Sequence, residues 1–168
     1  MTHGAGFPED NPWGDRQLED KNSDLVDLIQ QGTYFSNVPG ITFEYSNTGF
    51  ALLGQIVEKV SGKTLPKPIP KKNLPAILGM THTEWEYTKV PADKLAHGYR
   101  STGGQWAEEP LLHHGSYGAM GGLITSIEDF SKYVAFHQSA WPPRSGPEHS
   151  VLRRSTFGRC RCLAILVG

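Results

Sequence analysis

The sequence has little cysteine, no strong excess of charge and no long apolar run. Cys160 and Cys162 are its only cysteines, and two cysteines so close together cannot form a disulfide framework, so the redox compartment stays open. The formal net charge at pH 7 is −1, which gives no electrostatic reason to expect binding to nucleic acid or to an anionic membrane.

Signals for membrane insertion and export are also missing. No apolar stretch approaches the roughly 20 residues that a membrane-spanning helix needs. Residues 1–4 have neither the basic start nor the apolar run of a signal peptide. We therefore expect a soluble chain, and its compartment is not readable from the sequence.

The composition is that of an ordinary globular chain: 38% hydrophobic and 20% charged, with 19 Gly and 12 Pro that indicate much loop. A length of 168 residues fits one domain or part of a larger one. We expect residues 1–140 to form a partial domain. Residues 141–168 are expected to form a linker and an atypical tail, whose sequence suggests truncation or a frame shift.

The most informative stretch runs from residue 43 to residue 62. Asn47 is a good helix N-cap, and Gly62 can take the left-handed conformation that ends a helix. Between them, apolar residues recur at spacings of three and four, which predicts one buried helical face: Phe50, Leu53, Ile56, Val57 and Val60.

Tyr45 and Ser46 precede this helix, at the positive end of its dipole and next to free backbone donors. A phenol there could pass a proton to or from a nucleophile. A buried tyrosine before a helix cap is also common as a purely structural feature, so the spacing alone leaves both roles open.

The wording of the stretch is more specific: Tyr45-Ser46-Asn47, then Gly49, Leu52-Leu53-Gly54, Ile56, Glu58 and Ser61-Gly62-Lys63. It resembles the second motif of the class C beta-lactamase-like serine hydrolases, a family of beta-lactamases, DD-carboxypeptidases and family VIII esterases. The resemblance implies that Tyr45 is the general base or proton shuttle. It implies that Asn47 contacts the substrate and the catalytic lysine. The middle residue, Ser46, is not the nucleophile of that family.

The other two catalytic motifs of the family are not found in this sequence. Residues 2–8 resemble a family segment that follows the Ser-x-x-Lys motif by several dozen residues, and no Ser-x-x-Lys occurs at a helix start. The third motif, Lys or His followed by Thr/Ser and Gly, is also missing. We therefore expect the chain by itself to have little or no activity of the family type.

A second segment, Gly121 to Asp129, resembles the family loop that runs close to the substrate cleft. Gly121 and Gly122 either let a substrate approach the backbone or form a tight turn. Ser126 and Asp129 resemble a capping box at the start of a helix that continues to His137.

The remaining elements are read from local signals. Ser23 is expected to cap a short helix with Leu25, Leu28 and Ile29 inside. The proline-rich residues 65–72 favour a polyproline or surface-loop conformation. Residues 83–87 alternate as in a short strand, and residues 95–106 predict a β-hairpin that turns at two glycines.

Two other kinds of functional site have weaker support in the sequence, a metal site and an oxyanion loop. No spacing of the histidines matches a zinc site, so no metal and no cofactor are expected; the histidines considered are His82, His97, His113 and His114. An oxyanion loop at residues 3–6 would need a Gly-x-Ser-x-Gly elbow, and residues 115–118 are one residue short of it.

The expected fold is mainly α with a small β-hairpin, the incomplete helical subdomain of the beta-lactamase/transpeptidase-like α/β fold. The expected function is a serine hydrolase that acts on ester or amide (lactam) carbonyls through an acyl-enzyme, impaired in this chain. An esterase with Ser46 as substitute nucleophile and a non-catalytic ligand-binding protein remain alternatives. An exposed apolar face of the subdomain could cause self-association.

Overall fold

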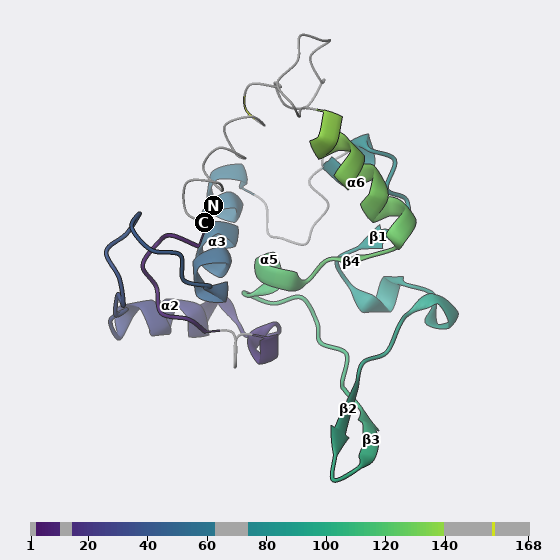
Figure 1. The fold of residues 1–168 in the computed structure, drawn as a ribbon, viewed down its shortest axis with the longest axis horizontal. Helices are drawn as coiled ribbons and strands as arrows, with labels where there is room; N and C mark the ends of the chain where they lie inside the picture. The colour runs from purple at the N-terminus through teal and green to yellow at the C-terminus, as the bar shows by residue number, and fades with distance from the viewer. Residues whose placement is uncertain (1–2, 11–14, 63–73, 140–155, 157–168) are drawn as a thin grey trace.

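The computed structural model describes residues 3–10, 15–62, 74–139 and 156. The expectations for the proline-rich residues 65–72 and for the tail at 141–168 lie outside the described residues, apart from residue 156. Figure 1 shows the described elements in two groups. Helices α2 (Asn22–Gln30) and α3 (Asn47–Ser61) lie on one side. Helix α6 (Ile127–Ser139) lies on the other side with the strands β1 (Thr83–Glu84) and β4 (Ile124–Thr125), and the short helix α5 (Gly118–Gly121) lies between the two groups.

The first group forms around helix α3 (Asn47–Ser61), helix α2 (Asn22–Gln30) and helix α5 (Gly118–Gly121). Leu25, Ala51 and Tyr117 make the buried core, and Leu52 and Met120 pack against it. A Cβ added at Gly54 of α3 would lie 2.6 Å from the Cβ of Ala119. The two helices therefore approach each other so closely that only small side chains fit between them.

The predicted start of α3 is wrong by one residue. Ser46, and not Asn47, is the N-cap: its backbone is extended (φ −139°, ψ 115°), and its Oγ accepts the Gly49 N–H at 3.1 Å. Both residue types are good caps, and the extended backbone of Ser46 decides between them. The predicted end is confirmed, because Gly62 is left-handed with φ 67°.

The predicted buried face of α3 is wrong in its second half, whereas Phe50 and Leu53 in the first half are half-buried. Ile56, Val57 and Val60 are 57%, 45% and 83% exposed. The buried positions include Ala51 and Gly54 instead. The reason is the close approach of α5, which selects the small-residue face of α3 and leaves the branched side chains outside.

Helix α2 also differs from its prediction, in its N-cap and in its buried residues. It begins after Lys21, whose N–H donates to the Asp24 carboxylate at 3.0 Å, so Ser23 lies inside the helix and is not its cap. Of its apolar residues Leu25 is buried, whereas Leu28 and Ile29 are each 38% exposed.

In the second group, strand β1 (Thr83–Glu84) pairs antiparallel with strand β4 (Ile124–Thr125). The predicted hairpin is confirmed as β2 (Tyr99–Thr102) and β3 (Gln105–Glu108). Its turn residues Gly103 and Gly104 have φ 61° and 79°, as the favoured two-residue hairpin turns require. The other short elements are α4 (Leu74–Ile77) and the 3-10 turns Asp15–Gln17, Tyr87–Lys89 and Ala92–Lys94.

Helix α6 (Ile127–Ser139) is anchored by a buried carboxylate. Ser126 Oγ accepts the Asp129 N–H at 3.1 Å, which confirms the predicted cap. The Asp129 carboxylate, however, accepts bonds from the His82 N–H at 2.6 Å, Thr83 Oγ1 at 3.0 Å and Lys132 Nζ at 2.8 Å. It therefore joins α6 to β1 instead of completing a capping box.

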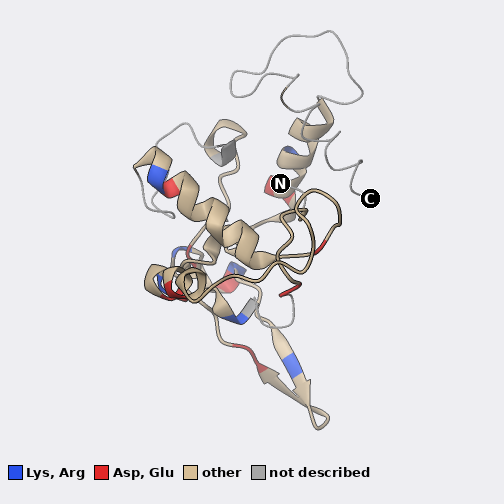
Figure 2. Cartoon of the chain, turned by 90° about the vertical axis from the view of Figure 1, so that its left-hand side faces the viewer, with Lys and Arg blue, Asp and Glu red and all other residues tan. Residues whose placement is uncertain are grey.

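In the cartoon of Figure 2, the positions of acidic and basic residues are spread along the chain, on helices, loops and the hairpin. None of the helices in the described residues combines the length and the apolar composition that a bilayer crossing requires.

Candidate active site

The Tyr-Ser-Asn motif lies at the N-terminus of α3, where a buried carboxylate holds the backbone. Asp10 is 2% exposed. It accepts the N–H groups of Asn47 and Thr48, each at 2.7 Å, and faces Ser46 Oγ at 3.4 Å. A negative charge is favourable here, because the first turn of a helix has free N–H groups and a partial positive charge. The helix that begins within the motif is therefore capped by two side chains, those of Asp10 and Ser46.

The contacts of Asp10 could not be predicted from local sequence patterns. Asp10 lies in a polar stretch of the sequence and is 37 residues from Asn47. No local spacing could connect the two residues, so the sequence carried no signal for this contact.

Tyr45 is held from one side by His3. The two rings stack with their centroids 4.4 Å apart and an interplanar angle of 22°. His3 Nδ1 also accepts the Ser46 N–H at 3.0 Å. Tyr45 itself is 38% exposed, whereas Ser46 and Asn47 are 4% and 6% exposed. Of the three motif side chains, only the phenol is well presented to solvent.

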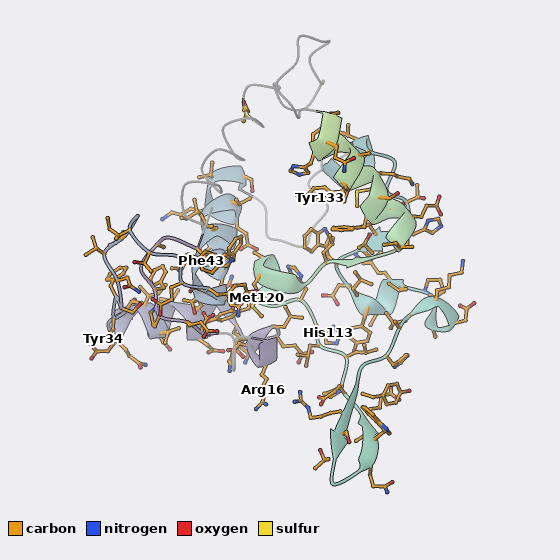
Figure 3. The ribbon with its side chains drawn as sticks, viewed as in Figure 1. Arg16, Tyr34, Phe43, His113, Met120 and Tyr133 are labelled. Atoms are coloured by element: carbon orange, nitrogen blue, oxygen red, sulfur yellow. The ribbon has the colours of Figure 1, made fainter. Side chains whose placement is uncertain are left out.

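The His3 ring also contacts Phe43 and Phe50, with centroids 5.3 Å and 4.9 Å away; Figure 3 labels Phe43 beside α3. Burial lowers the pKa of His3 below its ordinary value, although the Asp10 carboxylate opposes this shift. A neutral imidazole fits the observed bond, because Nδ1 must keep its lone pair to accept from Ser46.

A cavity of about 400 Å³ lies next to the motif. Its polar wall includes His3, Glu44 and Ser46, and its apolar wall includes Ala5, Phe7, Phe50, Leu53 and Ile56. The carboxylate of Glu44 accepts bonds from Glu9 N–H, Ser36 Oγ and Asn37 Nδ2. These bonds hold the pKa of Glu44 below its ordinary value, and the bond from Ser36 has the largest effect. They join the loop at 36–37 to the segment that enters the motif.

The glycine-rich segment packs around a histidine. A Cβ at Gly118 or at Gly122 would collide with the His114 ring, whereas a Cβ at Gly121 would meet nothing within 4 Å. Burial lowers the pKa of His114, and Glu86 and Glu58 oppose this shift. Gly122 thus has a packing role, and substrate binding by Gly121 and Gly122 stays a prediction.

The neighbouring histidines lie in different environments. His113, labelled in Figure 3, contacts Glu86 through Nδ1 at 3.0 Å and the Tyr87 hydroxyl through Nε2 at 3.1 Å. The His114 ring makes an edge contact with Trp85. Within residues 3–10, 15–62 and 74–139, no group of three or more His, Cys, Asp or Glu side chains is placed to hold a metal ion.

A family model described as Beta-lactamase matches residues 1–159. The chain belongs to the beta-lactamase family. Protein flp of Staphylococcus aureus (strain COL) is 29% identical over 142 residues, which cover 81% of this chain and 27% of flp. The chain therefore spans about a quarter of the length of this curated relative.

Two solved structures have folds similar to that of this chain. The octameric penicillin-binding protein homologue from Pyrococcus abyssi is 28% identical with a TM-score of 0.68, over 94% of this chain and 36% of that protein. A class C beta-lactamase is 27% identical with a TM-score of 0.60, over 82% of this chain and 36% of the enzyme. The family predicted from the Tyr-Ser-Asn motif is confirmed. The structure has the beta-lactamase/transpeptidase-like fold of these neighbours.

Proposed function

We propose that these residues carry the Tyr-Ser-Asn site of a serine hydrolase that acts on ester or amide (lactam) carbonyls through an acyl-enzyme. The observation that carries the proposal is the presentation of Tyr45. Its phenol is partly exposed on a motif whose neighbouring residues are buried and capped by Asp10. A proton-transfer group must be fixed in position and still reachable by its partner, and Tyr45 meets both conditions.

In this proposal each motif residue has one role. Tyr45 is the general base that takes the proton of an attacking serine hydroxyl. Asn47 is a substrate ligand, and Gly121 and Gly122 let the substrate approach the backbone. Ser46 is a helix cap, because its oxygen accepts from Gly49 and faces the Asp10 carboxylate, so a role as nucleophile would cost the helix its cap.

The 168-residue chain is proposed to form little or no acyl-enzyme by itself. Its sequence contains no Ser-x-x-Lys at a helix start and no Lys/His-Thr/Ser-Gly triplet. An acyl transfer needs an activated nucleophile and donors for the developing oxyanion. The proposed substrates are small esters or lactams, and the motif does not choose between them.

A chimera tests the role of Tyr45. The matching 36% of a class C beta-lactamase is replaced by this chain, and hydrolysis of a chromogenic cephalosporin is measured. We expect Tyr45→Phe to lower kcat by roughly 10²- to 10⁴-fold. Tyr99→Phe, which changes an exposed tyrosine on the β2–β3 hairpin, is the control. An active chimera that tolerates Tyr45→Phe would contradict the role as base.

Self-association is proposed as a second property. Ile56, Val57 and Val60 form an exposed apolar stripe on α3, and such stripes on a surface favour protein contacts. A second copy of the chain can supply the same stripe in a two-fold contact. The octameric assembly of the Pyrococcus abyssi homologue is a precedent for assembly in a similar protein.

A further inference from the structure

We propose that His3 is a positioning residue for Tyr45, which deepens the proposed function and rests on it for the catalytic consequence. The observation is that one residue holds the chain on both sides of Tyr45. The His3 carbonyl oxygen accepts the Glu44 N–H at 2.9 Å. The His3 Nδ1 accepts the Ser46 N–H at 3.0 Å.

The ring of His3 then acts on the Tyr45 side chain itself. Because the imidazole and the phenol ring stack at 4.4 Å, rotation of Tyr45 about χ1 would break a direct ring contact. Phe43 and Phe50 contact the other parts of the imidazole and fix its orientation. Two backbone bonds and one stacking contact thus restrict the phenol, although its surface stays open to a partner.

The backbone of His3 supports this role. Its φ is 54°, and it is the non-glycine residue found in the left-handed region among the described residues. Histidine is among the residue types enriched there, but the conformation is uncommon and costs free energy. That cost is offset here because the conformation lets the carbonyl and the ring of one residue reach Glu44 and Ser46 together.

Three substitutions separate the hydrogen bond from the stacking. His3→Asn keeps an acceptor oxygen at the position of Nδ1 and tolerates the left-handed backbone, but it removes the ring. His3→Phe keeps a stacking ring and removes the acceptor. His3→Ala removes both. His82→Asn is the matched control, because His82 lies by β1 in the other group of elements.

The readouts are amide exchange at Ser46 and the ring-proton shifts of Tyr45, both by NMR on the complete chain. We expect His3→Phe and His3→Ala to speed Ser46 exchange by about fivefold, as the loss of one hydrogen bond implies. We expect His3→Asn to keep the wild-type exchange rate. The Tyr45 ring shifts should move in His3→Asn and His3→Ala and stay closer to wild type in His3→Phe. Unchanged Ser46 exchange and unchanged Tyr45 shifts in His3→Ala would overturn the proposal.

The catalytic consequence is measured separately in the chimera. His3→Ala should lower kcat there when Tyr45 is present and change it no further in a Tyr45→Phe background, since a positioning residue acts through its partner. If Tyr45 is no base, both kcat effects vanish while the NMR differences remain. If His3 does not position Tyr45, the NMR differences vanish while the Tyr45→Phe effect remains. The two failures are therefore distinguishable.

Discussion

The carboxylate of Asp10 and the backbone of Asn47 are joined by a 2.7 Å hydrogen bond across 37 residues of sequence. A second bond of the same length reaches Thr48. These contacts tie the segment that contains Asp10 to the N-terminus of the helix that follows Tyr45.

Removal of the Asp10 carboxylate should destabilise the chain strongly. Asp10→Ala leaves two helix N–H groups without their acceptor, and each unsatisfied buried group costs about 1–3 kcal/mol. We expect a decrease in the free energy of unfolding of at least roughly 2 kcal/mol, measured by urea denaturation. Asp10→Asn keeps one acceptor oxygen and should lose less. Equal stability of Asp10→Ala and wild type would show that this cap does not hold the motif.

The glycines around His114 provide a matched pair of substitutions. Gly118→Ala places a methyl group against the His114 ring, whereas Gly121→Ala meets open space in the same short helix. Overpacking of a close contact costs about 1–3 kcal/mol, so Gly118→Ala should lower the melting temperature. Gly121→Ala should leave it unchanged or raise it slightly, because it removes conformational freedom from the unfolded chain.

The double variant Gly118→Ala with His114→Ala tests the cause of that loss. If the collision with the ring is responsible, Gly118→Ala should cost much less in the His114→Ala background than alone. An equal cost in both backgrounds would assign the effect to the backbone of α5.

The pH dependence of stability should reveal Asp129. Desolvation opposes its charge, but bonds from Lys132, the His82 N–H and Thr83 outweigh this and lower the pKa of Asp129. A carboxylate with a lowered pKa contributes stability above its unfolded-state pKa of about 4. That stability is lost as the pH falls through the lower folded-state value. Stability should therefore decline in acid below about pH 4.

Asp129→Asn should reduce the steepness of this acid-induced decline and also lower the melting temperature at neutral pH, since it breaks the link between α6 and β1. Glu128→Gln removes an exposed carboxylate one position earlier and is the matched control. An identical acid profile for Asp129→Asn and wild type would exclude Asp129 as the source.

The apolar stripe of α3 should make the molar mass depend on concentration. Val60→Lys places a charge at its most exposed position (83%) and should shift the chain toward monomer in sedimentation or light scattering. Lys59→Gln changes an exposed neighbour on the same helix and should not. A monomer at all concentrations, with no response to Val60→Lys, would contradict self-association through this face.

Local signals predicted the elements well where one residue decides the backbone. Gly62 ends α3, the two glycines make the hairpin turn, and Ser126 caps α6. Each depends on conformational preferences of a few neighbouring residues, so the sequence alone carries the information.

Contacts between residues far apart in the sequence explain the features that local patterns did not predict. The branched residues of α3 have the periodicity of a buried face, but α5 packs on the small residues because its backbone comes so close. The N-cap of α3 is Ser46 and not the predicted Asn47, and these adjacent residues have similar capping preferences. Asp10 and His3 reach the motif from the start of the chain, and no spacing along the sequence connects them to it.

The most direct test of the central claim is intact-mass spectrometry of the purified chain after incubation with a fluorophosphonate and, separately, with a penicillin. We expect no added mass on a chain that circular dichroism shows to be folded, since the Tyr-Ser-Asn site is present without its nucleophile motif. A single adduct on one serine, lost in Tyr45→Phe, would contradict this expectation, and its loss in Ser46→Ala would identify Ser46 as a working nucleophile.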